Sequence, residues 1–350
     1  MNIFQIIIDT ITNEGLIAVV FSSIFITLLG FYLRKRGTLN ETAGKTLSAV
    51  LLTVAIPALA FNGFMTNIDY ESMRQGIQVL IWGIAIYIVL IIATIPIFAK
   101  YKGDEQTVLR MLSIFGSTTF FGIPIISAIY GPEGAMFAAL FNIGYRIFLY
   151  SYCYIKFSGL KLEGKNIKDM LLNPIVVATF LGLVIWLTQN YMPQVQVAVG
   201  DGYQSFGFLR IDRTLPWLHR PLTFLQPVAS PLAWLAIGAT LAEISLKEAA
   251  KEKAAWYYTL VKVGFVPAIN LVFLLVLSMT GIMPVSQVAF ATMMIMMATP
   301  AATVATAFAI GFKKEEVLAS NCSLLSTIIA VLVMPIWIII IEIIYNLGIF

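Results

Sequence analysis

Residues 116–124 read GSTTFFGIP, and residues 298–303 read ATPAAT. Both stretches lie inside long apolar blocks, where a helix is the expected structure because about 20 apolar residues cross about 30 Å of hydrocarbon. Proline removes a backbone donor and clashes with the preceding turn. The backbone groups that are freed within a membrane must be satisfied by protein, water or ligand. These two stretches therefore predict interrupted membrane helices that together hold a polar site.

The composition places the rest of the chain in a membrane as well. Hydrophobic residues make up 59% of the 350 positions and charged residues 11%, whereas a soluble domain is about half apolar and about a quarter charged. We predict an all-α polytopic membrane protein with ten transmembrane helices. The expected spans are residues 15–33, 42–64, 76–99, 107–130, 133–156, 170–189, 222–243, 256–280, 284–310 and 315–346.

The basic residues predict an orientation. Sixteen Lys and Arg residues fall in loops after odd-numbered spans, and four fall on the opposite side. Because positively charged loops stay in the cytoplasm, both termini are expected outside the cell membrane. The loop 190–221 is expected to be an extracellular insertion.

Proline motifs recur at matching positions in the two halves of the chain. Pro57 and Pro124 are 67 residues apart, and Pro231 and Pro300 are 69 residues apart. Transporters are often built from inverted repeats whose interrupted helices form the binding site. Five spans per half reverse the orientation of the second half, so we expect inverted repeats over residues 1–157 and 170–350.

The same motifs carry a family resemblance. Residues 51–61 (LLTVAIPALAF), 121–126 (FGIPII) followed by Tyr130-Gly131, and 230–233 (SPLA) resemble the auxin efflux carrier family, which includes plant carriers and bacterial malate permeases. The likeness covers nearly the whole chain, and the short loop 157–169 resembles the bacterial branch. Many relatives have asparagine a few residues before Gly-Ile-Pro, where this chain has Ser117.

The resemblance implies a ten-helix inverted-repeat fold and a homodimer. Spans 1, 2, 6 and 7 would form a scaffold, and spans 3–5 and 8–10 a mobile transport domain, with broken helices 4 and 9 crossing at their prolines. It also implies small carboxylate substrates, malate-like or auxin-like. The candidate substrate-binding residues are Ile56, Pro57, Ser117, Thr118, Gly122, Pro124, Asn142, Arg146, Thr299, Pro300, Thr303 and Asn321.

Two basic residues fall within spans. Arg146 is expected near mid-bilayer, where an arginine is costly and faces the bundle interior. It could bind a substrate carboxylate, anchor other protein groups, or extend to the interface. Lys262 lies two turns from the cytoplasmic end of its span, so its stem is expected to reach the interface.

Other functions have less support in the sequence. Paired aspartates, HExxH and Ser/His arrangements of intramembrane enzymes are absent, and the charges lie in short loops, so no enzyme, cofactor, metal or nucleic-acid partner is expected. No Asp or Glu falls in the middle of a span, which argues against a carboxylate-based proton couple. A ligand sensor or anion channel on the same fold, and a sodium-coupled symporter, stay open as alternatives. The expected partners are a small organic carboxylate, the lipid bilayer and a second copy.

Overall fold

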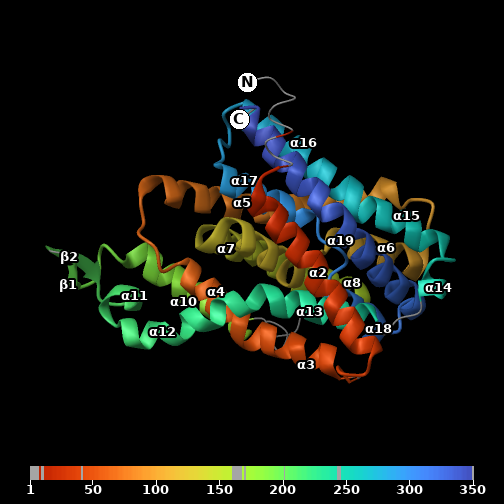
Figure 1. Ribbon diagram of the computed structural model, residues 1–350. Helices are drawn as coiled ribbons and strands as arrows, with labels where there is room; N and C mark the ends of the chain where they lie inside the picture. The colour runs from red at the N-terminus through yellow and green to blue at the C-terminus, as the bar shows by residue number, and fades with distance from the viewer. Residues whose placement is uncertain are drawn as a thin grey trace.

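Apolar blocks of membrane-spanning length form helices here because a helix satisfies every backbone group within the segment. The computed structural model describes residues 8, 12–40, 42–159, 168, 171–200, 202–242 and 246–348 (Figure 1). The elements before residue 160 are α2 (Glu14–Lys35), α3 (Ala43–Val50), η1 (Leu51–Ala55), α4 (Ile56–Gly63), α5 (Tyr70–Ile97), α6 (Gly103–Ile114), η2 (Thr118–Gly122), α7 (Ile123–Phe148), η3 (Leu149–Cys153) and α8 (Tyr154–Ser158).

The second part of the chain adds more helices and one hairpin. Its elements are α10 (Pro174–Thr188), β1 (Gln194–Val199), β2 (Gly202–Gly207), α11 (Ile211–Thr214), α12 (Pro216–Leu225), η4 (Gln226–Val228), α13 (Ala229–Leu241), α14 (Leu246–Ala249), α15 (Lys253–Leu260), η5 (Val261–Phe265), α16 (Val266–Met279), α17 (Gln287–Met297), α18 (Thr303–Gly311) and α19 (Glu316–Asn346). Within the described residues, seven continuous helical stretches are long and apolar enough to cross a membrane, and α10 and α17 are shorter apolar helices. The chain is a multi-pass membrane protein, and the count of ten spans stays a prediction.

The prolines do not break their helices where the sequence predicted. Pro57, Pro124 and Pro267 each lie in the first turn of a helix that directly follows a π-helical segment, respectively η1, η2 and η5. Proline has no N–H and crowds the carbonyl four residues earlier, and a π-turn relieves both by shifting the hydrogen bonds to five-residue spacing. The helices therefore continue through Pro57 and Pro124, and the expectation of breaks at these two positions is wrong.

The first interruption lies instead at residues 115–117, between α6 and η2. The second lies at residues 298–302, between α17 and α18, and includes Pro300 as expected. The predicted turn between spans 4 and 5 is a kink at Gly131, whose φ of 61° suits glycine.

The helices pack in two groups. The first helix group consists of α2, α3, α4, α10, α12 and α13, and the second of α5, α6, α7, α8, α14, α15, α16, α17, α18 and α19. In the first group, α2 and α13 approach closely, because a Cβ on Gly238 would lie 1.9 Å from the carbonyl oxygen of Thr27. Such small-residue contacts are how helices pack in lipid. The groups meet mainly where α7 contacts α2, α4 and α13.

The loop expected as an insertion contains a β-hairpin, which the all-α prediction missed. Strands β1 and β2 pair antiparallel, and the hairpin projects at the left of Figure 1. Arg210, buried beside it, fixes this segment to the first helix group. Its guanidinium donates to Asp212, to Asn67 Oδ1 at 3.0 Å and to Gln189 Oε1 at 2.6 Å.

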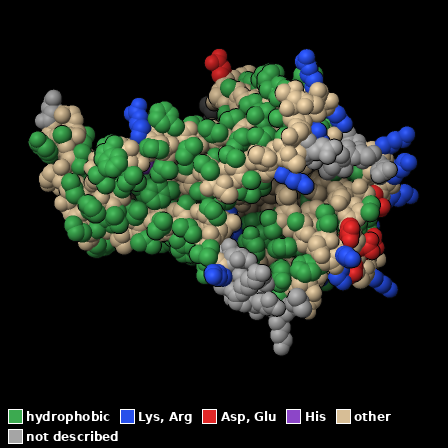
Figure 2. Space-filling view, turned by 90° about the horizontal axis from the view of Figure 1, so that it is seen from below, with side chains coloured by type: hydrophobic (Ala, Val, Ile, Leu, Met, Phe, Trp, Pro, Cys, Tyr) green, Lys and Arg blue, Asp and Glu red, His purple; other side chains and the backbone are tan. Residues whose placement is uncertain are grey.

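The surface matches a protein that lipid surrounds. Figure 2 shows Lys, Arg, Asp and Glu side chains gathered mainly toward the end of the molecule where α14 and α18 lie, while hydrophobic side chains cover much of the remaining face. Large apolar side chains also point outward along single helices, such as Phe21 and Leu28 on α2 and Ile81 and Ile92 on α5. In water these stripes would be unusual, whereas in hydrocarbon they are the expected outer surface.

Candidate substrate site at the helix crossing

The two interrupted helices cross and join through their backbones. Gly116 and Ala301 form an antiparallel β-bridge. The amide of Ser117 donates to the carbonyl oxygen of Pro300 at 2.8 Å, and the amide of Ala302 donates to the carbonyl oxygen of Phe115 at 3.0 Å. Backbone groups that the interruptions release from the helical ladders are thus satisfied by each other, as a dry interior requires.

Gly116 is needed for this contact because no space exists for a side chain. A Cβ at this position would lie 2.2 Å from Thr299 Oγ1 and 2.9 Å from Lys262 Nζ. The preceding ring, Phe115, stacks on Tyr87 with centroids 5.6 Å apart and so fixes the direction in which the chain leaves α6. The crossing is therefore a tightly packed element.

Four helix ends meet at the crossing. Helices α6 and α17 end there, at Ile114 and Met297, and η2 and α18 begin there, at Thr118 and Thr303. The first amides of a helix have no acceptor within the helix, and the start of a helix is the positive pole of its dipole, so the starts of η2 and α18 favour anions. The C-terminal ends of α6 and α17 carry carbonyls without donors in the same helix and the negative pole of the dipole.

Two of the predicted polar residues, Thr118 and Asn142, hold the start of η2 in place. Thr118 Oγ1 donates to Asn142 Oδ1 at 2.6 Å, and Asn142 Nδ2 donates to the carbonyl oxygen of Ala138 at 3.1 Å. Both side chains are buried. Asn142 thus anchors the crossing to the middle of α7.

Lys262 does not reach the membrane interface, so that expectation is wrong. It lies in η5, its side chain is fully buried, and its Nζ donates to the carbonyl oxygen of Ser113 at 3.0 Å. The π-helical backbone turns this side chain toward the end of α6. Among the described residues, Lys262 has no carboxylate partner.

Arg146 lies in the interior, as its depth predicted. Its side chain is 8% exposed, and its Nη2 is buried without any hydrogen-bond partner among the described residues. It lines two cavities, one of about 90 Å³ on the crossing side and one of about 220 Å³ between α7 and α10. The residues around the first cavity are Leu52, Ser117, Thr119, Phe120, Tyr145, Arg146, Leu149, Tyr150, Asn173, Ile175, Thr303 and Val304.

The first cavity, which we call the arginine cavity, lies between the two helix groups. Leu52 and Asn173 reach it from the first group. Ser117, in the first interruption, and Thr303, directly after the second, reach it from the second group. Hydroxyl groups and one amide therefore surround a guanidinium. This donor-rich set suits a small anion.

The predicted site residues divide into three sets. Ser117, Arg146 and Thr303 line the arginine cavity. Thr118, Gly122, Asn142, Thr299 and Pro300 belong to the packed crossing: Thr299 donates to the carbonyl oxygen of Met296, and Gly122 packs against the Met296 sulfur. Ile56, Pro57, Pro124 and Asn321 line neither cavity of Arg146.

Sequence reasoning missed several residues of the site. Thr119 and Asn173 line the arginine cavity, and the hydroxyl of Ser326 accepts from the amide of Ala301 at 3.1 Å. Thr119 was adjacent to a named residue. Asn173 followed by Pro174 was a helix-start signal, which the structure confirms, since Asn173 Oδ1 accepts from the amide of Ile175.

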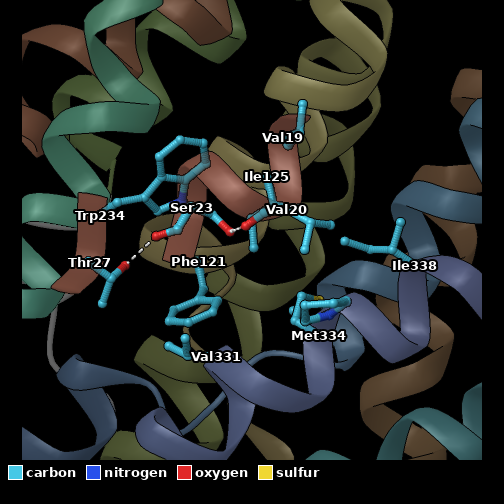
Figure 3. A pocket seen from close by; sticks show the side chains of 11 residues that line it. Val19, Val20, Ser23, Thr27, Phe121, Ile125, Trp234, Val331, Met334 and Ile338 are labelled. Atoms are coloured by element: carbon cyan, nitrogen blue, oxygen red, sulfur yellow. Dashed lines mark hydrogen bonds between the residues drawn. The ribbon is translucent and has the colours of Figure 1, made fainter. Parts of the chain in front are cut away.

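A second region between the helix groups is apolar. Figure 3 shows a small cavity among α2, η2, α7, α13 and α19, lined by residues such as Val20, Phe121, Trp234 and Met334. The only hydroxyls labelled there, Ser23 and Thr27, donate to carbonyls of their own helix. An apolar seam of this kind offers few specific contacts to break when the groups move.

The buried charged side chains of the described residues are all basic. Arg146, Lys262 and Arg210 are buried, and no Asp or Glu is among the fully buried side chains of the described part of the chain. Arg210 has Asp212 as a partner, whereas no carboxylate among the residues that the structure describes pairs with Arg146 or Lys262. An interior with this balance attracts an anion.

Comparison with known proteins agrees with this architecture. The Mem_trans family, described as membrane transport protein, matches residues 16–338. The chain belongs to this family. The resemblance to the auxin efflux carrier family is thereby confirmed. Membership of the Mem_trans family identifies a membrane transporter and gives no indication of an enzyme.

Two archaeal relatives are similar to this Mem_trans protein. An uncharacterized transporter of Methanocaldococcus jannaschii is 22% identical over 236 residues, which cover 65% of this chain and 70% of that protein. An uncharacterized transporter of Methanothermobacter thermautotrophicus is 30% identical over 131 residues, which cover 36% of this chain and 42% of that protein. Neither name specifies a substrate.

Proposed function

We propose that this Mem_trans protein carries small organic carboxylate anions, malate-like or auxin-like, across the cell membrane by alternating access. The observation that carries the proposal is the buried Nη2 of Arg146, which has no protein partner among the described residues and borders a cavity. A guanidinium presents a planar fork that matches a carboxylate. An unpaired buried donor is costly, and a bound carboxylate would remove that cost.

The surroundings of Arg146 support a carboxylate ligand. Ser117 and Thr303 offer hydroxyl donors, and Thr303 is the first residue of α18, whose starting end carries the positive pole of the helix dipole. The larger cavity on the other side of Arg146 is mostly apolar, with Ile143, Val176 and Phe180 among its residues. It could receive the apolar part of an organic acid.

The location of the arginine cavity supports alternating access. A ligand held between two helix groups is exposed to one side or the other when one group shifts. We propose that the first helix group is the fixed scaffold and the second the mobile transport domain of an elevator. The inverted repeats, the homodimer and the external position of both termini complete this proposal. Cysteine labelling of the loop 34–45 from outside intact cells would contradict the proposed orientation.

A transport assay tests the proposed function. The purified protein is reconstituted in proteoliposomes, and uptake of labelled aliphatic dicarboxylates and aromatic monocarboxylates is measured. We expect saturable uptake that unlabelled substrate inside the vesicles accelerates, because exchange is a property of alternating access. Non-saturable current without exchange would instead indicate a channel, and binding without uptake a sensor.

A further inference from the structure

The amino group of Lys262 is fully buried, and Lys262 lines neither cavity of Arg146. Its Nζ donates to the carbonyl oxygen of Ser113, which lies in the last turn of α6 just before the interruption. It also lies close to the crossing itself, because a Cβ on Gly116 would be 2.9 Å from this nitrogen. No carboxylate among the described residues pairs with it.

The C-terminal end of an interrupted helix favours a cation. Its last carbonyls lack intrahelical donors and form the negative pole of the helix dipole. In membrane transporters with interrupted helices, such carbonyls and half-helix ends coordinate the coupling sodium ion. An ammonium offers the same unit charge, with three donors in place of coordination bonds.

We infer that Lys262 is a built-in cation that occupies the position of a coupling sodium ion at the C-terminal end of α6. Three observations support this: the complete burial of the side chain, its bond to the Ser113 carbonyl, and the absence of a carboxylate partner in the described part of the chain. The consequence for transport, which rests on the proposed function, is anion movement without sodium. The cation site itself does not depend on that function.

Two variants separate an ion site from simple packing. Lys262→Ala removes the charge and leaves space beside the Ser113 carbonyl for an ion. Lys262→Met removes the charge and fills the same space with an unbranched apolar chain. The thermal midpoint of each purified protein is measured in sodium chloride and in choline chloride at equal ionic strength.

We expect sodium to raise the midpoint of Lys262→Ala by several degrees, because an ion that binds only the folded state stabilises it. The original protein and Lys262→Met should show no difference between the two salts. If Lys262→Ala is recovered folded only from sodium buffer, the inference is supported in the same way. Equal midpoints of Lys262→Ala in both salts, or its equal loss in both, would overturn the inference.

Transport then tests the consequence. Substrate uptake by the original protein should be equal in sodium and in choline, and Lys262→Ala should require sodium. A sodium requirement in the original protein would overturn the inference. If the original protein shows no uptake while the thermal results hold, the proposed function is wrong and the cation site stands.

Discussion

The hydroxyl of Ser230 donates a hydrogen bond to the carbonyl oxygen of Pro124, 2.8 Å away, and thereby joins α13 to α7. The bond crosses from the first helix group to the second, along a seam whose other contacts are largely apolar. It connects two of the proline motifs that first indicated a repeated architecture. If one group slides past the other, this bond has to break.

Ser230→Ala should therefore accelerate exchange. A hydrogen bond stabilises a folded state by about 0.5–1.5 kcal/mol. Its loss should therefore raise the rate at which the protein leaves the conformation with the Ser230–Pro124 bond about two- to tenfold. The assay is exchange of labelled substrate in proteoliposomes. Thr240→Val on the same helix is the control, because the Thr240 hydroxyl donates to the carbonyl oxygen of Ala236 within its own helix. Equal rates for Ser230→Ala and the original protein would show that the bond persists through the cycle.

Arg146→Ala should abolish saturable uptake and the thermal shift that substrate induces, while the basal midpoint stays equal or rises. The reason is that Nη2 of Arg146 has no described partner, so its removal leaves no protein group unsatisfied there. Arg146→Lys should rescue poorly because lysine lacks the planar fork. A normal substrate-induced shift in Arg146→Ala would contradict the ligand role.

Arg210→Ala is the matched control for Arg146. Arg210 is at least as buried as Arg146, but its guanidinium is hydrogen-bonded to Asp212, Asn67 and Gln189. Its loss should lower stability by about 3–5 kcal/mol, as when one partner of a buried pair is removed. The measurement is the thermal midpoint in detergent. A basal loss for Arg146→Ala as large as that for Arg210→Ala would make Arg146 an anchor.

Gly116→Ala should destabilise the crossing by about 1–3 kcal/mol, the usual cost of overpacking. The added methyl would meet Thr299 Oγ1 at 2.2 Å and displace Lys262. Gly264→Ala, in the same η5 segment as Lys262, is the control, since its Cβ would find the nearest atom at 3.9 Å. Thermal melting of both variants checks this. Equal midpoints for the two would mean that the crossing relaxes.

Thr118→Val should lower the free energy of unfolding by about 1–3 kcal/mol, because the buried Oδ1 of Asn142 loses its described donor. Thr118→Ser keeps the hydroxyl and should behave like the original protein. Melting temperature and uptake are measured for both variants. A stable Thr118→Val variant with full uptake would show that the bond between Thr118 and Asn142 does not stabilise the crossing.

Much of the helical framework was predictable because apolar length decides membrane helices. The expected spans 15–33 and 315–346 lie close to α2 and α19. The meeting of the two interruptions was also predictable, since residues 116–124 and 298–303 both contain proline and threonine within apolar blocks. Ser117 and Thr303 were named as candidate substrate-binding residues for this reason, and both line the arginine cavity.

Other features depend on tertiary structure. The position of the first interruption was missed because a π-turn can absorb a proline, and only packing decides where it does. Lys262 was misplaced because sequence gives the depth of a residue in a helix, whereas its direction depends on the η5 turn. The hairpin was an avoidable miss. Its strand QVQVAV alternates polar and apolar residues and is followed by Gly200 and Gly202.

The bridge between Gly116 and Ala301 has a consequence for how this family can diverge. Its two hydrogen bonds join main-chain atoms, so exchanging most side chains nearby leaves both bonds intact. Alanine substitutions at the neighbouring residues other than Gly116 would not remove the two main-chain bonds that hold the interruptions together. The donors around the arginine cavity can therefore differ between relatives while the crossing persists.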